Sequence, residues 1–222
     1  MGKTDRAPVR QARAMDTRAR LLAAARQAFA EQGHDGVNLK TDILEPAGVS
    51  IGSFYHQFTD KTDLLVTLLD EAVDEWRDEV IGADVMVRGE GLEGALRASF
   101  TRFFAGLERG EDLWRIHLRE RTSPEPRIRD RVRRGRDAWR RDIAALFAAD
   151  RPAPGYPERA ADLLLAFSVG LAGEYLDRPK RQRTAAARRE LVEEVTRFAV
   201  GGLGALRDRT PTHDDDHPVR PR

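Results

Sequence analysis

A short polar stretch, Ser50–Gln57, carries side chains suited to recognising DNA. Its hydroxyl, imidazole and amide groups can hydrogen-bond to base edges or to phosphate oxygens. Gly52 and its neighbouring serines are small, which lets a helix backbone lie deep in a major groove. Phe54 and Phe58 interrupt the polar pattern at helical spacing, so we expect them to anchor such a helix to a core.

A helix-turn-helix would present this polar face. Leu39–Glu45 and Ser50–Phe58 are the predicted helices, and Ala47-Gly48-Val49 is a turn whose glycine permits a sharp reversal. Pro46 lacks an N–H and clashes with the preceding turn, so the first of these helices is expected to end there.

Longer helices are predicted on both sides of this motif. Apolar spacing predicts a helix over Thr17–Gly33, and Asn38 is placed to cap the next one. Asp60 and Asp63 resemble a capping box at the start of a long helix that runs to Ile81. A three-helix head followed by one long helix is the expected arrangement.

The motif resembles the signature of the TetR family of bacterial transcriptional regulators. The residues that carry this resemblance are Ala47-Gly48-Val49-Ser50, then Gly52-Ser53-Phe54-Tyr55-His56-Gln57-Phe58, then Lys61 and Leu64. The resemblance implies that base edges face Ser50, Ile51, Gly52 and Ser53, and that phosphates or base edges meet Tyr55 and His56. It also implies phosphate contacts near helix starts, from Lys40, Thr41 and Lys61.

Several residues depart from the family pattern. His34 stands where an aromatic residue is usual, and Asn38 stands where Thr or Ser is usual. Pro46 is unusual in the second helix, and Ile51 offers only an apolar contact, for example to a thymine methyl group. Specificity is therefore expected from the neighbours of Ile51.

The rest of the chain reads as helical, so the fold class is all-α with about nine helices. Further helices are predicted over 92–107, 112–121, 127–149, 157–176 and 184–206, and no strand is predicted. The expected organisation is a flexible basic arm (1–15), a helix-turn-helix domain (16–62), a helical ligand-binding and dimerisation domain (63–207) and a disordered tail (208–222).

Dimerisation and a ligand pocket follow chiefly from the resemblance. The helices at 157–176 and 184–206 are the expected homodimer interface, because they are rich in apolar and small residues. An unknown small apolar ligand is expected in a pocket built from an aromatic-rich set: Trp76, Phe100, Phe103, Phe104, Trp114, His117 and Trp139. Ordinary core packing is the alternative for each of these residues.

Composition narrows the other function classes. The chain has 222 residues and no cysteine, which excludes disulfides and thiolate metal sites and fits a cytoplasmic protein. No apolar run is long enough to cross a membrane, and no metalloprotease, nucleophile-elbow or P-loop motif occurs. We expect no catalytic residues, no metal and no cofactor.

The sequence therefore predicts a ligand-responsive repressor that binds a palindromic operator in double-stranded DNA as a dimer. The alternative is a helical small-molecule-binding protein or enzyme that merely retains the N-terminal motif. Activation is the alternative to repression. In the expected mechanism, ligand binding shifts the helix that begins at Lys61 and so changes the separation of the two recognition helices.

Overall fold

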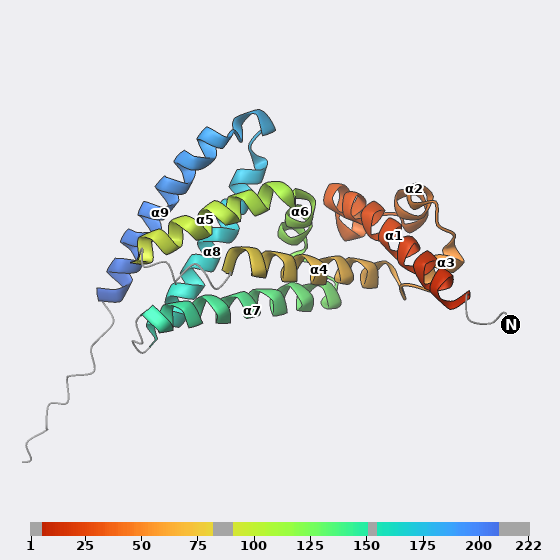
Figure 1. The fold of residues 1–222 in the computed structure, drawn as a ribbon, viewed down its shortest axis with the longest axis horizontal. Coiled ribbons are helices and arrows are strands. Elements are labelled where there is room, and N and C mark those ends of the chain that lie inside the picture. Colours follow the sequence, from red (N-terminus) through yellow and green to blue (C-terminus); the bar gives the residue numbers. More distant parts are fainter. Residues whose placement is uncertain (1–5, 82–90, 151–154, 209–222) are drawn as a thin grey trace, which may run out of the picture. The chain divides into compact units, whose positions relative to one another are not determined.

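A computed structural model of the chain describes residues 6–81, 91–150 and 155–208 (Figure 1). All regular secondary structure in these ranges is helical: nine α-helices, one π-helical segment and one 3-10 turn. The expected all-α class with about nine helices is confirmed. The elements are α1 (Arg6–Gly36), η1 (Leu39–Leu44), α2 (Glu45–Ala47), α3 (Ile51–Tyr55), α4 (Lys61–Ile81), α5 (Gly91–Arg109), α6 (Glu111–Glu120), α7 (Pro126–Asp150), α8 (Tyr156–Asp177), η3 (Lys180–Gln182) and α9 (Ala185–Asp208).

The chain divides into two compact units that are not consecutive in sequence. Unit 1 comprises the described parts of Met1–Trp76 together with Leu107–Gly135, and unit 2 comprises those of Arg77–Gly106 and Arg136–Arg222. Unit 1 therefore contains α6 as well as the helix-turn-helix segment. The functional boundary that the sequence predicts after residue 62 stays a prediction.

In unit 1, α1 packs against η1, α2 and α6. The apolar stripe Leu21, Ala25 and Phe29 is fully buried, as the helical spacing predicts. Gly33 interrupts α1 with a left-handed φ of 72°. A Cβ at this position would lie 2.7 Å from the Cδ of Arg119, so glycine permits both the kink and the close approach of α6.

The segment expected to be a flexible arm is helical from its sixth residue. Helix α1 begins at Arg6, and Pro8 lies in its first turn, where a missing N–H breaks no hydrogen bond. The residues that follow are mostly strong helix formers, such as alanine, arginine and glutamine. Residues 1–5 of the expected arm lie outside the described residues, as do residues 209–222 of the expected tail.

The second helix ends around Pro46, as the sequence predicts, although it includes Pro46 and runs one residue further, to Ala47. The helical path continues through α2, with Pro46 in its first turn. The preceding turn is widened, because the N–H of Glu45 donates to the carbonyl of Lys40, five residues earlier. This π-type turn accommodates the proline without the clash that a regular α-helical turn would impose.

In unit 2, α8 packs against α9, and aromatic rings join α5 and α7 to α8. Phe104 packs against Tyr175 with ring centroids 5.0 Å apart, and Phe147 meets Tyr156 edge-on at 5.9 Å. Thr184 caps α9 by accepting the N–H of Ala187 at 3.2 Å.

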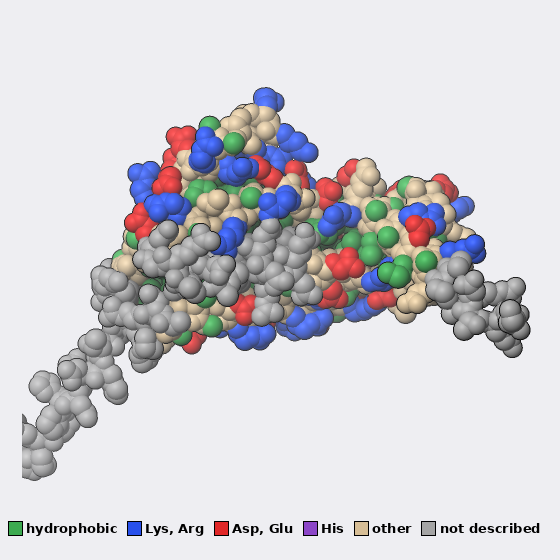
Figure 2. Space-filling view, in the orientation of Figure 1, with side chains coloured by type: hydrophobic (Ala, Val, Ile, Leu, Met, Phe, Trp, Pro, Cys, Tyr) green, Lys and Arg blue, Asp and Glu red, His purple; other side chains and the backbone are tan. Residues whose placement is uncertain are grey.

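The surface carries mixed charge. Side chains of both signs are interspersed over the face shown in Figure 2, in keeping with the net charge of +1. Within the described ranges, no helix is long and apolar enough to cross a membrane. The same ranges contain no cluster of three or more His, Asp or Glu side chains placed to hold a metal ion.

Candidate DNA-binding interface

The turn before the recognition helix is held by backbone and side-chain hydrogen bonds. Gly48 adopts a left-handed conformation (φ 60°, ψ 38°), and the N–H of Val49 donates to the carbonyl of Leu44 at 3.0 Å. The guanidinium of Arg20, from α1, donates to the carbonyl of Ala47 at 3.1 Å. Arg20 therefore ties α1 to the turn, a role that its position in the sequence did not reveal.

The recognition helix is short and is capped by its own serines. Helix α3 spans Ile51–Tyr55, and hydrogen-bonded turns continue it to Phe58, whose N–H donates to the carbonyl of Phe54 at 2.9 Å. The hydroxyl of Ser50 accepts the N–H of Ser53 at 3.2 Å, and the two hydroxyl oxygens lie 2.9 Å apart. One of these hydroxyls therefore donates to the other, which leaves fewer donors for an outside partner.

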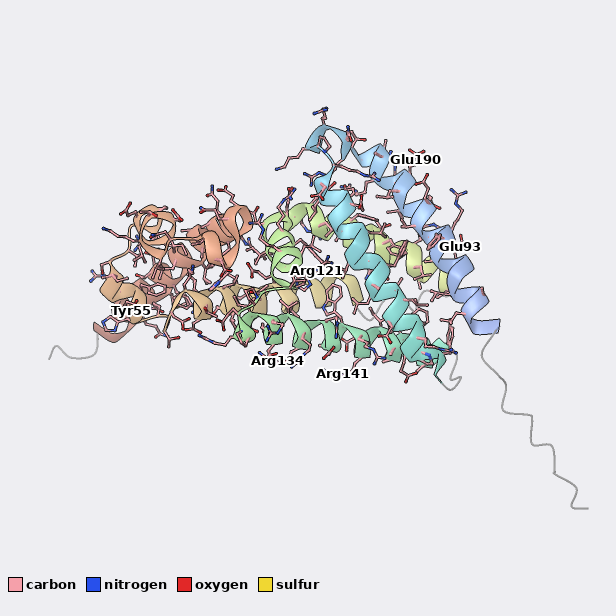
Figure 3. The ribbon with its side chains drawn as sticks, turned by 180° about the vertical axis from the view of Figure 1, so that it is seen from behind. Tyr55, Glu93, Arg121, Arg134, Arg141 and Glu190 are labelled. Carbon is pink, nitrogen blue, oxygen red and sulfur yellow. The ribbon has the colours of Figure 1, made fainter. Side chains whose placement is uncertain are left out.

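Burial separates anchors from exposed residues along α3. Phe54 and Phe58 are buried with ring centroids 5.8 Å apart, as the sequence predicted. Ile51 is 51% exposed and Tyr55 is 59% exposed, although both are large apolar-bodied residues. Tyr55 is labelled in Figure 3. Gly52 and His56 are also exposed, and no atom lies within 4 Å of a Cβ built on Gly52.

Other predicted contact residues lie beside α3. A hollow is lined by residues that include Lys40 from η1 and Ser50 and Ile51 from the start of α3. Asn38 caps η1 by accepting the N–H groups of Lys40 at 2.9 Å and Thr41 at 3.3 Å. The structure thus places Lys40 next to the recognition helix.

Thr41 is less available than its position suggested. Its hydroxyl donates to Asp42 at 2.8 Å. The backbone N–H of Asn38 and this hydroxyl hold the pKa of Asp42 below its usual value, so the carboxylate is ionised beside Thr41. A phosphate approaching Thr41 would meet that negative charge.

Lys61 is engaged inside the molecule. Its ammonium donates to the carbonyls of His34 at 2.6 Å and Val37 at 2.7 Å. These carbonyls follow the interruption at Gly33, where the α1 ladder leaves acceptors without helical partners. The structure gives Lys61 the role of tying the end of α1 to the start of α4, whereas the sequence predicted a phosphate contact.

His34 and Glu120 complete this junction. The backbone N–H of His34 donates to the buried carboxylate of Glu120 at 2.8 Å, and its ring Nε2 lies 3.0 Å from the hydroxyl of Thr62. Sequence reasoning missed Glu120, because its partner lies 86 positions away in the chain. A glutamate at the end of an amphipathic helix is normally predicted to be a surface residue, because charged side chains are rarely buried.

The predicted cap of α4 is confirmed and carries a further partner. Asp60 accepts the N–H of Asp63 at 2.6 Å, and Asp63 accepts the N–H of Thr59 at 2.9 Å. Partial burial opposes ionisation of Asp60, but this backbone bond and the guanidinium of Arg127, 2.7 Å away, lower its pKa overall. Arg127 thus links α7 to the start of α4.

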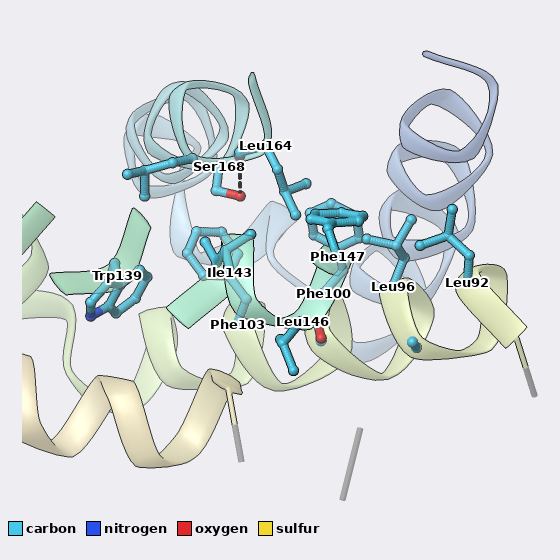
Figure 4. Close-up of a pocket in the computed structure, with 13 residues that line it drawn as sticks. Leu92, Leu96, Phe100, Phe103, Trp139, Ile143, Leu146, Phe147, Leu164 and Ser168 are labelled. Carbon is cyan, nitrogen blue, oxygen red and sulfur yellow. Dashed lines mark hydrogen bonds between the residues drawn. The ribbon is translucent and has the colours of Figure 1, made fainter. Parts of the chain in front are cut away.

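The predicted pocket is realised only in part. A cavity of about 80 Å³ in unit 2 includes Phe100, Phe103 and Trp139 in its lining (Figure 4). Phe104 does not line it and packs on Tyr175. Trp114 and His117 belong to α6 in unit 1 and do not line it either. The side chain of Trp76 lies outside the described residues.

His117 is instead a half-buried side chain with a shielded Nδ1 and a neutral imidazole. Burial, with smaller effects from the charges of Arg131 and Arg121, lowers its pKa to about 4. Its ring packs edge-on against Trp114 at 5.8 Å. The structure therefore favours the core alternative that the sequence left open for His117.

Large apolar side chains are exposed on the two helices predicted to dimerise. Leu163 on α8 is 57% exposed and Phe198 on α9 is 68% exposed. Phe198 stacks on Phe167 with ring centroids 5.1 Å apart. Open space lies beyond Gly170 and Gly173 on α8, so another backbone can approach this helix closely.

Comparison with known proteins agrees with this geometry. A model of the TetR family of bacterial regulatory proteins matches residues 21–68. The HTH-type transcriptional activator FasR of Mycolicibacterium smegmatis is 28% identical over 192 residues, which cover 85% of this chain and 83% of FasR.

Solved structures share the fold along most of the chain. The fatty acid degradation regulator FadR of Bacillus halodurans superposes with a TM-score of 0.69 at 20% identity and covers 84% of this chain and 96% of its own. A TetR family regulator from Streptomyces coelicolor is 28% identical with a TM-score of 0.59, and covers 82% of this chain and 90% of its own.

Proposed function

Because the chain is a member of the TetR family of transcriptional regulators, we propose that it binds a two-fold symmetric operator as a homodimer and leaves that operator when a small apolar ligand binds. In this proposal the protein acts in the cytoplasm, has no catalytic role and uses no cofactor. Two copies of α3 enter successive major grooves about 34–36 Å apart, one helical turn of DNA.

The exposure pattern of α3 is the observation that carries this proposal. A helix that buries Phe54 and Phe58 while leaving Ile51, Tyr55 and His56 in solvent is anchored on one side and uncovered on the other. Exposed large side chains on so short a helix favour a macromolecular partner. Small residues at Gly52 and Ser53 allow that partner to approach the backbone closely.

We assign base contacts to the start of α3 and backbone contacts to its end and to η1. Ser50, Ile51, Gly52 and Ser53 face bases, and Ile51 meets a thymine methyl group. Tyr55, His56, Lys40 and Thr41 contact phosphates or base edges. Lys61 supports binding through the fold, since its two carbonyl acceptors already orient its ammonium.

The proposed dimer uses α8 and α9. A second copy would cover Leu163 and Phe198, which otherwise lie in water. Phe198→Asp is expected to convert the dimer to a monomer in light scattering coupled to size-exclusion chromatography. Arg189→Asp, exposed on the opposite side of α9, is the matched control and should leave the dimer intact. A dimer that survives Phe198→Asp would place the interface elsewhere.

Repression by blocking a promoter is the proposed outcome of operator binding. Activation is the second candidate, because the relative FasR is named a transcriptional activator. Transcription in vitro from the native promoter, with and without the protein, separates the two by the sign of the change in transcript.

Selection of bound duplexes from a random DNA pool tests the core proposal. We expect a two-fold symmetric sequence to be enriched, and His56→Ala or Ile51→Ala to weaken binding to it. Gln27→Ala, exposed on α1, is the control that should bind normally. If no duplex were enriched even at low salt, where phosphate contacts are strongest, the DNA-binding proposal would fail.

A further inference from the structure

The cavity in unit 2 has a lining that is almost entirely hydrocarbon. The hydroxyls of two serines and the indole N–H of Trp139 are the only polar side-chain groups among thirteen lining residues, and no ionisable side chain is present. The hydroxyl of Ser168 already donates to the carbonyl of Leu164 at 2.8 Å. A charged group inside this lining would lose its hydration without gaining an oppositely charged partner, so we expect the buried part of any ligand to be apolar.

The cavity is long in relation to its volume. Its lining residues on α5 run from Leu92 to Phe103, a rise of about 16 Å along a helix. On α7 they run from Trp139 to Phe147, and Figure 4 shows the labelled side chains strung out between Trp139 and Leu92. The volume of about 80 Å³ is roughly half that of an engineered cavity of about 150 Å³ that holds benzene. Free space this small, spread over that length, is narrow throughout.

We propose that this cavity binds the unbranched hydrocarbon chain of an aliphatic amphiphile, with the polar head group outside the apolar lining. A single file of methylene groups matches a long and narrow space, whereas a fused or caged ring system needs width. The proposal names the ligand class of the regulator proposed above and rests on that function for its regulatory meaning. A fatty acid, its glycerol ester and its thioester share this chemistry, so they are compared directly.

Calorimetric titration of the full-length protein with straight-chain carboxylates tests whether the cavity binds an unbranched hydrocarbon chain. From propanoate to undecanoate we expect the affinity to rise about fourfold per methylene until the chain has filled the cavity, because a buried methylene contributes about 0.8 kcal/mol. Adamantane-1-carboxylate has the same carbon number and charge as undecanoate, and should bind at least tenfold more weakly. A flat series, or equal binding of the caged carboxylate, would overturn the proposal.

The source of the chain is distinguished by the head group. Undecanoate, its monoglyceride and its coenzyme A thioester are titrated in parallel. Binding that depends on chain length in any of them supports the proposal, and the tightest names the source. Absence of binding by all three overturns it.

Two variants in the lining and one control locate the site. Ser99→Phe should fill the cavity and lower chain affinity at least tenfold, whereas Thr101→Phe, on the exposed side of the same helix, should not. If Ser99→Phe fails to fold, Ser99→Ala still decides the matter, because it removes the hydroxyl and adds no bulk to the lining. Retained affinity in Ser99→Ala supports an apolar ligand, and lost affinity would show that the hydroxyl recognises a polar one.

Binding to the selected operator separates this inference from the proposed function. If the protein binds its operator but none of the straight-chain amphiphiles, the ligand class is wrong and the DNA-binding function stands. If the chain binds and operator affinity does not change, the cavity assignment stands and ligand-responsive regulation fails.

Discussion

The recognition segment and the cavity differ in how the chain builds them. Between Asn38 and Asp63 the starts of η1, α3 and α4 are each capped by a side chain two or three residues from the N–H that it accepts, so much of the recognition segment is set by local contacts. The cavity joins side chains from α5, α7 and α8, up to 76 positions apart between Leu92 and Ser168. Residue type matters at each position in the first region, whereas size and apolarity matter in the second.

This difference explains why one functional site can be recognised from the sequence and the other cannot. A segment that binds an outside partner needs particular groups at fixed spacing, so it forms a recognisable motif. A cavity tolerates exchange among hydrophobic residues of similar volume, so no motif marks it. Substitutions in both regions can break or sharpen this contrast.

Truncating a buried ring in each region should give the largest effect. Phe54→Ala and Phe100→Ala each remove a buried ring and should lower the free energy of unfolding by about 3–5 kcal/mol. Only Phe54→Ala should abolish operator binding at a temperature where both variants are folded. Urea denaturation and gel shift measure the two effects. Equal loss of DNA affinity in Phe100→Ala would remove the contrast.

Lowering the pH should destabilise the unit that contains α6. The folded pKa of His117 is about 4, below its ordinary value of 6.5, so the neutral form stabilises the fold fully above pH 6.5. This stabilisation, up to about 3 kcal/mol at about 1.4 kcal/mol per pKa unit, should be lost as the pH falls from 6.5 to 4. Urea denaturation across this range should show a shallower pH dependence in His117→Gln. An unchanged pH dependence would mean that His117 is not the group responsible.

Substitution of Lys61 and of Lys40 should distinguish a lysine that stabilises the fold from one that contacts a phosphate. Lys61→Met leaves two carbonyls without their donor and should lower stability by about 1–3 kcal/mol, with the salt dependence of DNA binding unchanged. Lys40→Met should leave stability unchanged and reduce the salt slope by about 1.8, which is about 0.9 for each of the two copies in the dimer. The opposite pattern would restore the phosphate role that the sequence predicted for Lys61.

Serine hydroxyls should give the smallest effects. Ser50→Ala removes the cap of α3 and should cost about 1 kcal/mol of stability. Ser168→Ala removes a hydroxyl that only back-bonds to its own helix, and should change stability by less than about 0.5 kcal/mol. Thermal unfolding of both variants measures the difference, and equal shifts would contradict it.

Sequence reasoning succeeded where contacts are local. The caps at Asn38 and Asp60, the break at Gly33 and the burial of Phe54 and Phe58 all follow from residue type and spacing, and the structure confirms each. The helical class followed from the same periodicity.

Sequence reasoning failed where the role of a residue depends on a partner far away in the sequence. Lys61 was read as a phosphate contact because its carbonyl acceptors lie 24 and 27 positions earlier in the chain. The aromatic set mixed two compact units, since composition cannot tell which rings share a cavity. The widened turn before Pro46 was not predicted, because such a turn has no signature in residue type.

The bond between the His34 N–H and Glu120 bears on how such proteins can be recombined. In a chimera that joins only the first 62 residues to another regulator, the N–H of His34 would lose its hydrogen-bond acceptor, because that acceptor belongs to α6. The transferable cassette is discontinuous, and includes Leu107–Gly135. Exchange of operator specificity between relatives by a single crossover would therefore succeed only where the recipient supplies its own carboxylate at the position of Glu120.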